Sequence, residues 1–310
     1  MIKFSAVVPV YNEANNLVKL HKELLDVLER LGTYEIIYVD DGSDDATAQT
    51  LRHLHPATTI TLQRNYGQSV ALDVGLKQAR GEYLITIDAD LQNDPQDIPR
   101  LYRHLRKHRL DVVAGWRQKR HDPLLVRAIT RVARILRRIL VNDGVHDSGC
   151  TLRVYRRDAA RSLDLWGEMH RYVIALLRWK GFRIGEIPVN HRPRYRGKSK
   201  YTSLKAINGF TDLLFMWFIN KYSRRPLHLF GLLSLLLFFA GMAIEAWMAY
   251  LKLFRGASLS DNAFFPLGFF MILIALLLFV SGVLIDIMLR SYYNTAPIDR
   301  RYRIKEIRRT

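Results

Sequence analysis

The sequence predicts an α/β domain with a mostly parallel sheet, followed by two helices long and apolar enough to cross a membrane. Three observations support this fold class. Strand patterns alternate with helix patterns in the N-terminal part, the strand patterns run into polar or acidic clusters, and two long apolar stretches occupy the last third. Alternating strands and helices are the pattern of a parallel sheet.

The first element patterns are short and follow one another regularly. Strands are expected at residues 4–10, 35–39, 83–87 and 111–114. Between the first two strands, leucines recur at the spacing of one helix face: Leu17, Leu20, Leu24, Leu28 and Leu31. Further helices are expected at residues 47–54 and 69–78.

The strand pattern at residues 83–87 runs directly into Asp88 and Asp90. A buried charge is costly unless it is paired or bound to a metal. Because residues i and i+2 of an extended chain point the same way, both carboxylates can converge on one cation. Carboxylate oxygens suit Mg²⁺ or Mn²⁺, and Mg²⁺ often bridges to substrate phosphates. The simpler alternative is a polar strand end with a turn at residues 93–95.

Two earlier strand patterns also end in carboxylates, the first at Glu13 and the second at Asp40 and Asp41. In parallel α/β sheets, ligands bind beyond the carboxyl ends of the strands. The three acidic clusters are therefore expected to face one crevice. Neither Gly-x-Gly-x-x-Gly nor Gly-x-x-x-x-Gly-Lys-Ser/Thr occurs, which argues against the usual dinucleotide and P-loop sites.

Charge is distributed unevenly along the 310 residues. The net charge is −7 for residues 1–99, +21 for residues 100–226 and +4 for residues 227–310. A basic middle segment implies an anionic partner, which could be nucleic acid, membrane lipid or a phosphate substrate. The single cysteine, Cys150, excludes an internal disulfide and fits a reducing compartment, and no signal peptide is visible.

Residues 228–251 and 263–289 are almost wholly apolar. Each exceeds the ~20 residues needed to cross a hydrocarbon core, whereas a buried core helix is the simpler alternative. Lysines and arginines lie before the first stretch and after the second, which places both termini in the cytoplasm. The sequence thus predicts a transmembrane hairpin in the inner or plasma membrane.

Two amphipathic helices are expected to lie at the membrane surface. The first covers residues 125–139, with an apolar stripe and a separate stripe of Arg127, Arg131, Arg134 and Arg138. The same pattern also fits a helix packed on the sheet with a solvated arginine face. The second covers residues 203–222 and leads into the first apolar stretch.

Four sequence blocks stand in a fixed order: VPVYNE at 8–13, DDGS at 40–43, RNYG at 64–67 and DADLQ at 88–92. Together they resemble a family 2 glycosyltransferase of the GT-A fold. The resemblance implies that the first two blocks hold the nucleotide of a sugar donor. It also implies that the Asp-x-Asp block holds Mg²⁺ or Mn²⁺ on the donor diphosphate.

Two more blocks narrow the resemblance: DSGCTLRVYR at 147–156 and RYRGKSKY at 194–201. They are similar to blocks of polyprenyl-phosphate glycosyltransferases, such as dolichyl-phosphate mannose synthases and bacterial carrier-lipid glucosyl and aminoarabinose transferases. The implied organisation is a cytoplasmic GT-A catalytic domain (1–200), an interfacial region (201–226), two transmembrane helices (227–290) and a basic cytoplasmic tail (291–310).

The resemblance and the charge pattern assign candidate residues. The metal ligands are Asp88, Asp90 and Gln92. The donor site is expected to comprise Pro9, Tyr11, Glu13, Asp40, Asp41, Gly67, Asp88 and Ala89. The acceptor phosphate is expected to meet Arg131, Ser148, Arg196, Ser199 and Lys200. The catalytic residues are Asp90, Arg117 and Arg131, with Arg117 placed after a strand as a second cation for the leaving group.

The expected reaction is an inverting, metal-dependent transfer of a sugar to an undecaprenyl or dolichyl monophosphate. A UDP-hexose is the preferred donor and GDP-mannose the alternative one. A processive polysaccharide synthase is a competing interpretation, but Ala175 stands where its Gln-x-x-Arg-Trp motif needs glutamine before Arg178 and Trp179. A catalytically inert membrane-anchored binding module is another, although no nucleic-acid-binding signature supports it. Hairpin members of the group often associate, so a homo-oligomer is also an expectation.

Overall fold

The computed structural model describes residues 2–118, 136–193, 204–222, 225–256, 258, 262–295 and 304–309. The chain divides into two compact units, one of residues 1–213 and 299–310 and the other of residues 214–298. The expected α/β fold with a mostly parallel sheet is confirmed.

The first unit is built on an eight-stranded sheet in the order β7-β5-β6-β4-β1-β2-β3-β8. Its strands are β1 Phe4–Val10, β2 Tyr34–Asp40, β3 Thr58–Leu62, β4 Tyr83–Thr86, β5 Val112–Trp116, β6 Arg153–Arg156, β7 Ile184–Pro188 and β8 Ile304–Arg309. Pairings of β1 with β2 and β4, of β2 with β3, and of β5 with β7 are parallel. Strand β6 runs antiparallel between β4 and β5, and β8 runs antiparallel to β3. The carboxyl ends of the six parallel strands therefore share one edge.

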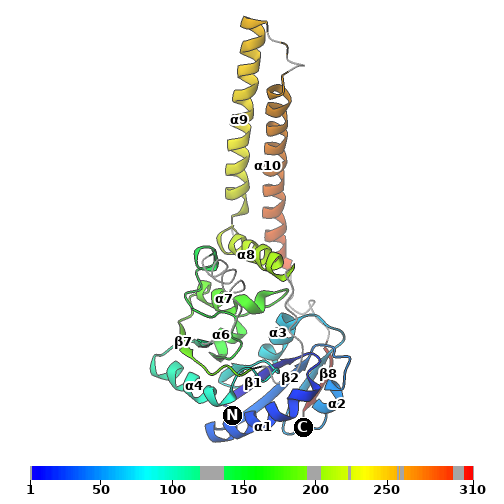
Figure 1. Cartoon of the computed structure of the whole chain (residues 1–310), viewed down its shortest axis with the longest axis vertical. Coiled ribbons are helices and arrows are strands. Elements are labelled where there is room, and N and C mark those ends of the chain that lie inside the picture. Colours follow the sequence, from blue (N-terminus) through cyan, green and yellow to red (C-terminus); the bar gives the residue numbers. More distant parts are fainter. Residues whose placement is uncertain are drawn as a thin grey trace. The chain divides into compact units, whose positions relative to one another are not determined.

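Helices cover both faces of this sheet (Figure 1). They are α1 Ala14–Leu31, α2 Thr47–Leu51, α3 Gln68–Gln78, α4 Ile98–Lys107, α6 Arg157–Arg161 and α7 Val173–Trp179, with 3₁₀ helices η1 Pro95–Asp97 and η2 Met169–Tyr172. The predicted leucine stripe of α1 is buried against one face, where Leu17, Leu20 and Leu24 are inaccessible to solvent. Helix α3 packs on the opposite face, close to Val7 and Val39.

The second unit contains two long helices that lie side by side, α9 Pro226–Arg255 and α10 Phe264–Thr295 (Figure 1). Both are long and apolar enough to cross a membrane, with mean hydropathy of 2.2 and 2.9 in their most apolar parts. Only 11% and 17% of those parts is buried, so neither is the core helix of a soluble domain. Their backbones approach closely where a Cβ on Gly241 would lie 2.8 Å from the Gly268 carbonyl oxygen.

A helix is present where the interfacial helix was expected at residues 203–222, as α8, Leu204–Tyr222, and its place at a membrane surface stays a prediction. The basic amphipathic helix expected at residues 125–139 lies mostly outside the described residues, although residues 136–140 are helical. The tail contains an element that the sequence patterns did not predict, because β8 joins the sheet beside β3. Its sequence alternates charged and apolar residues too weakly to indicate a strand without the edge that it pairs with.

Gly75 of α3 marks the tightest helix–sheet contact, because a Cβ there would lie 2.3 Å from Cγ1 of Val7. We predict that Gly75→Ala lowers the free energy of unfolding by about 1–2 kcal/mol, since overpacking outweighs the gain in helix propensity. Denaturant unfolding of the detergent-solubilised protein measures it. The double variant Gly75→Ala/Val7→Ala should lose less than the sum of the single changes. A strictly additive result would contradict this close approach.

Candidate active site

A pocket of about 380 Å³ opens at the carboxyl edge of the sheet. It is lined by residues from the ends of β1, β2 and β4 and from the start of α3: Pro9, Val10, Tyr11, Glu13, Asp41, Asn65, Gly67, Gln68, Ala71, Asp88, Ala89 and Asp90. The structure thus brings together seven of the eight residues predicted for the donor site. The eighth, Asp40, is buried and does not line the pocket.

A larger hollow of about 730 Å³ lies at the opposite, amino edge of the sheet. Its arginines already serve the fold, because Arg157 Nε donates to the Gly81 carbonyl oxygen at 2.7 Å and Arg161 to that of Ala79 at 3.4 Å. Ligands of parallel α/β sheets bind at the carboxyl edge. The smaller pocket is therefore the better candidate for the active site.

The turn after β2 is organised by the two adjacent aspartates. Asp40 is buried and its Oδ1 accepts hydrogen bonds from the Ser43 backbone N–H (3.0 Å) and hydroxyl (2.6 Å). Asp41 accepts the backbone N–H groups of Tyr66 (2.7 Å) and Gly67 (2.9 Å). Burial raises the pKa of Asp41, and these two hydrogen bonds act against that rise. Asp40 therefore shapes the turn after β2, whereas Asp41 connects this turn to the segment of Tyr66 and Gly67 that precedes α3.

Asp88 and Asp90 lie just beyond β4, as predicted. Oδ1 of Asp88 accepts a hydrogen bond from Gln68 Nε2 at 2.8 Å, and Oδ1 of Asp90 accepts one from the Gln92 backbone N–H at 3.1 Å. Burial, reinforced by the charge of Asp90, raises the pKa of Asp88 from 3.8 to about 6, while Arg117 and Arg153 act in the opposite direction. The pair is thus a site of unfavourable negative charge at the pocket wall.

This carboxylate pair suits a divalent cation. No three His, Cys, Asp or Glu side chains converge on a metal position in the described part of the chain. Mg²⁺ commonly takes only one or two protein carboxylates and completes its shell with water and substrate phosphate. A cation between Asp88 and Asp90 would also offset the repulsion that raises the Asp88 pKa. Gln92, the third predicted ligand, takes part in this loop through its backbone N–H.

Helix α3 connects the pocket to η2 through its first two residues. Gln68 binds Asp88, and the next side chain, Ser69, accepts a hydrogen bond from the His170 backbone N–H at 2.9 Å. The Ser69 hydroxyl also lies 2.9 Å from Nδ1 of His170. Burial, aided by the charges of Arg171 and Arg153, lowers the pKa of His170 to about 3, so its imidazole is neutral. Neither Gln68 nor His170 was predicted from the sequence.

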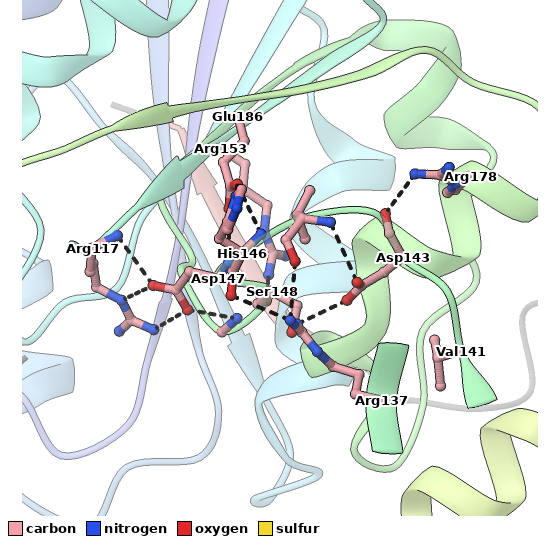
Figure 2. A network of polar contacts seen from close by, with 12 residues as sticks. Arg117, Arg137, Val141, Asp143, His146, Asp147, Ser148, Arg153, Arg178 and Glu186 are labelled. Atoms are coloured by element: carbon pink, nitrogen blue, oxygen red, sulfur yellow. Dashed lines mark hydrogen bonds and ion pairs between the residues drawn. The ribbon is translucent and has the colours of Figure 1, made fainter. Parts of the chain in front are cut away.

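Arg117, at the end of β5, is held by Asp147 in a bidentate ion pair (Figure 2). Its Nε and Nη2 donate to Oδ2 and Oδ1 of Asp147 at 2.7 and 2.9 Å, and both side chains are largely buried. Desolvation opposes the charge of Arg117, but the contact with Asp147 outweighs it and raises the Arg117 pKa. The charge of Arg117 acts to lower the pKa of Asp88, although its guanidinium is paired with Asp147.

The loop of residues 141–149 is held by further polar contacts (Figure 2). Arg137 Nη1 pairs with Oδ2 of Asp143 at 2.9 Å. The side chain of Glu186 on β7 accepts the backbone N–H groups of His146 (2.9 Å) and Asp147 (2.8 Å). Arg178 donates to the Asp143 carbonyl oxygen at 3.3 Å. The loop that carries Asp147 is therefore held from three places, by Arg137 before it, by Glu186 of β7 and by Arg178 of α7, which no spacing in the sequence indicates.

Ser148, predicted on the acceptor side, contributes its carbonyl oxygen, which accepts a hydrogen bond from Arg153 Nη2 at 2.7 Å. Arg153 is only 1% exposed and stands between Thr86 and Ala114 of the neighbouring strands. Its signal in the sequence was a lone arginine inside the strand pattern LRVY. The other predicted acceptor residues, Arg131, Arg196, Ser199 and Lys200, lie outside the described residues.

Comparison with known sequences agrees with this geometry. A model of the family described as "Glycosyl transferase family 2" matches residues 5–164. The chain is 34% identical over 302 residues to dodecaprenyl-phosphate galacturonate synthase from Rhizobium johnstonii, covering 94% of this chain and 89% of that protein. It is 31% identical over 316 residues to undecaprenyl-phosphate 4-deoxy-4-formamido-L-arabinose transferase from Salmonella typhimurium, covering 98% and 93%.

Solved structures resemble the catalytic part of the chain. Mannosyl-3-phosphoglycerate synthase from Rubrobacter xylanophilus has a TM-score of 0.58 at 20% identity, over 70% of this chain and 74% of that one. Glucosyl-3-phosphoglycerate synthase from Mycobacterium tuberculosis, in complex with Mn²⁺, UDP and its product, has a TM-score of 0.54 at 18% identity, over 71% and 80%. These similarities confirm the predicted GT-A fold.

The raised pKa of Asp88 gives a prediction about the metal-free protein. A carboxyl group with a raised pKa destabilises the folded state above that pKa, so Asp88→Asn should stabilise the protein in EDTA at pH 7.5. The gain is at most about 2–3 kcal/mol. It should shrink as the pH falls through 6 and vanish below about pH 3, where the carboxyl is protonated in both the folded and the unfolded state. Thermal unfolding at several pH values measures it.

Asp111→Asn is the matched control with the opposite sign. Burial acts to raise the pKa of Asp111, but its contacts with Arg183 outweigh burial and the pKa is lowered. Its carboxylate therefore stabilises the fold above pH 4, and Asp111→Asn should be less stable than the parent at pH 7.5. Destabilisation by both substitutions at pH 7.5 would contradict our account of Asp88.

Proposed function

The chain belongs to glycosyl transferase family 2, and we propose that it transfers a sugar from a nucleotide-sugar donor to a polyprenyl monophosphate with inversion at the anomeric carbon. Transfer to polyprenyl phosphate follows from relatives that are 31–34% identical over nearly the whole chain and are named for that acceptor. The observation that carries the donor side is the carboxylate pair Asp88 and Asp90 at the wall of the carboxyl-edge pocket.

The donor is expected to bind with its nucleotide between the ends of β1, β2 and β4. Glu13 and Asp41 line this pocket and can accept hydrogen bonds from ribose hydroxyls or base N–H groups. The diphosphate would lie towards Asp88 and Asp90, where Mg²⁺ or Mn²⁺ can be held. When bound, the cation neutralises charge that develops on the departing nucleoside diphosphate.

The acceptor phosphate is already anionic at neutral pH, so its oxygen can attack the anomeric carbon without a strong general base. The protein's task is to bring two anions together and to offset their repulsion. Arg117, just after β5, and Arg153, at the start of β6, supply positive charge, and both favour the ionised form of Asp88. Arg131, Arg196, Ser199, Lys200 and Ser148 remain our candidates for holding the acceptor phosphate.

A processive polysaccharide synthase is less well supported by the structure. Ala175, which stands where the synthase motif needs glutamine, is buried within α7. Trp179 Nε1 donates to the Val141 carbonyl oxygen at 3.1 Å, and Arg178 donates to that of Asp143. These two residues support the loop of residues 141–149.

The direct test uses membranes that contain the protein, undecaprenyl phosphate and a panel of radiolabelled nucleotide sugars. We propose a UDP-linked hexose or hexose derivative as donor, with GDP-mannose as the second candidate. Radiolabel should pass into the lipid fraction in an acid-labile linkage. Hydrolysis of the donor without a lipid product, for every sugar in the panel, would contradict the proposed acceptor.

The metal requirement gives the next prediction. Asp90→Ala should reduce transfer by at least about a hundredfold while the protein stays folded and membrane-inserted, because one of two charged ligands is lost. Steady-state transfer at a series of Mg²⁺ and Mn²⁺ concentrations measures this. The control is Asp158→Ala, which removes a carboxylate at the amino edge of the sheet. Full activity of the parent protein in excess EDTA would refute metal dependence.

We propose that α9 and α10 form a transmembrane hairpin with the catalytic unit and both termini in the cytoplasm. Strand β8, which follows α10, pairs with β3 of the catalytic sheet. The chain that leaves through α9 must therefore return to the same side through α10. This supports an even number of crossings independently of the Lys/Arg distribution.

Cysteine labelling in intact cells tests this topology. A cysteine at position 258, in the connector between α9 and α10, should react with a membrane-impermeant reagent, whereas a cysteine at position 310 should react only after lysis. Background should be low because the native Cys150 is inaccessible and burial raises its pKa to about 11. Labelling of position 310 but not of position 258 in intact cells would overturn the hairpin as drawn.

A further inference from the structure

The chain approaches the predicted acceptor-phosphate block, residues 194–200, along a path fixed by the loop that follows the carboxylate pair. We call residues 88–97 the carboxylate loop and residues 190–192 the entry segment. The backbone N–H of Arg192 donates to the Gln92 carbonyl oxygen at 2.8 Å, and that of Asn190 donates to Oδ2 of Asp97 at 2.7 Å. Between these bonds, His191 forms an antiparallel bridge with Asn93.

The side chain of Arg192 adds two ion pairs to this contact. Its Nη1 lies 2.7 Å from Oε2 of Glu23 on α1, and its Nη2 lies 2.7 Å from Oδ1 of Asp94 in the carboxylate loop. The Arg192 side chain is one-third exposed, so both pairs are partly shielded from water. A single guanidinium therefore joins α1, the carboxylate loop and the entry segment, and we call this set of contacts the clamp.

The four carboxylates of the carboxylate loop divide into two pairs. Asp88 and Asp90 line the donor pocket. Asp94 and Asp97 instead hold the entry segment, and Asp94 also caps η1 by accepting the Gln96 N–H at 3.0 Å. The same ten residues thus shape the donor site and fix the approach to the acceptor block.

We propose that Arg192 is a positioning residue for the acceptor: it sets the point at which the chain enters the acceptor-phosphate block, beside the metal carboxylates. The inference rests on the proposed function, because it takes residues 194–200 to meet the lipid phosphate. It concerns Arg192 and its partners alone. Losing these ion pairs should weaken use of the acceptor and leave donor binding intact, since the donor pocket does not include Arg192.

Arg192→Gln removes the charge and keeps the length and hydrogen-bonding capacity of the side chain. We expect the apparent KM for undecaprenyl phosphate to rise about tenfold, which corresponds to the loss of one charge-assisted contact between the acceptor block and the lipid phosphate. The KM for the donor should change less than about twofold. The matched control is Arg183→Gln, which breaks a comparable pair with Asp111 away from the entry segment. It should leave both KM values unchanged.

Two further variants separate positioning from direct contact with the lipid phosphate. Glu23→Gln and Asp94→Asn each remove one partner of Arg192, and asparagine can still cap η1. If Arg192 acts by positioning, both variants should raise the acceptor KM as Arg192→Gln does. If Arg192 instead binds phosphate directly, freeing it should leave the acceptor KM unchanged or lower it. That result would overturn the inference.

Hydrogen exchange gives a readout that does not depend on the substrate. The amides of Asn190 and Arg192 should be protected in the parent protein and exchange about tenfold faster or more in Arg192→Gln, because their partners lie on the carboxylate loop. Unchanged protection would refute the clamp even if the variant were inactive. Absence of any lipid-linked product from the parent protein, with the expected exchange pattern, would refute the proposed function and not the clamp.

Discussion

Two like charges at the end of a buried strand impose the constraint on which the site depends. Asp88 and Asp90 follow β4 in a setting where burial raises the pKa of Asp88. Such a pair persists only where the surroundings offset its repulsion. Here Gln68 orients one oxygen of Asp88, the Gln92 N–H engages Asp90, and Arg117 and Arg153 supply positive charge. A divalent cation would complete the balance.

The arginines themselves need partners, and this requirement extends the polar network away from the pocket. Arg117 is largely buried and pairs with Asp147, whose backbone is held in turn by Glu186. Removing one partner of a buried ion pair commonly costs several kcal/mol, because the other charge is left unpaired. The loop of residues 141–149 is therefore held by charge pairing as well as by the burial of Val141 and Val145. This explains why acidic residues occur at all in so basic a segment.

The chain connects the unit of α9 and α10 to the catalytic sheet at both of its ends. Helix α8 leads towards α9, and the chain after α10 ends in β8 on the edge of the sheet. An unpaired edge strand is prone to pair with other chains, and β8 covers the β3 edge. Strand β3 also leads to the Tyr66–Gly67 backbone that Asp41 holds. The C-terminal strand β8 thus supports the same side of the donor pocket as Asp41, which binds the Tyr66 and Gly67 backbone.

The family resemblance supplied donor-pocket residues such as Pro9, Tyr11 and Gly67. Local pattern and composition by themselves determined the fold class, the strands β1, β2, β4 and β5, the helices α1 to α3, the two apolar helices and the acidic clusters of the donor pocket. These features are readable because periodicity, strand-end carboxylates and apolar length act locally along the chain. The tertiary structure alone decided the pairing of Arg117 with Asp147, the burial of Arg153, the contact of Gln68 with Asp88 and the clamp at Arg192. Each joins residues between 20 and 169 positions apart, or depends on burial that only the assembled sheet creates. Spacing along the sequence does not show which charged residues meet, because these pairings depend on the order of the strands in the sheet. The two antiparallel strands, β6 and β8, were not predicted from the sequence.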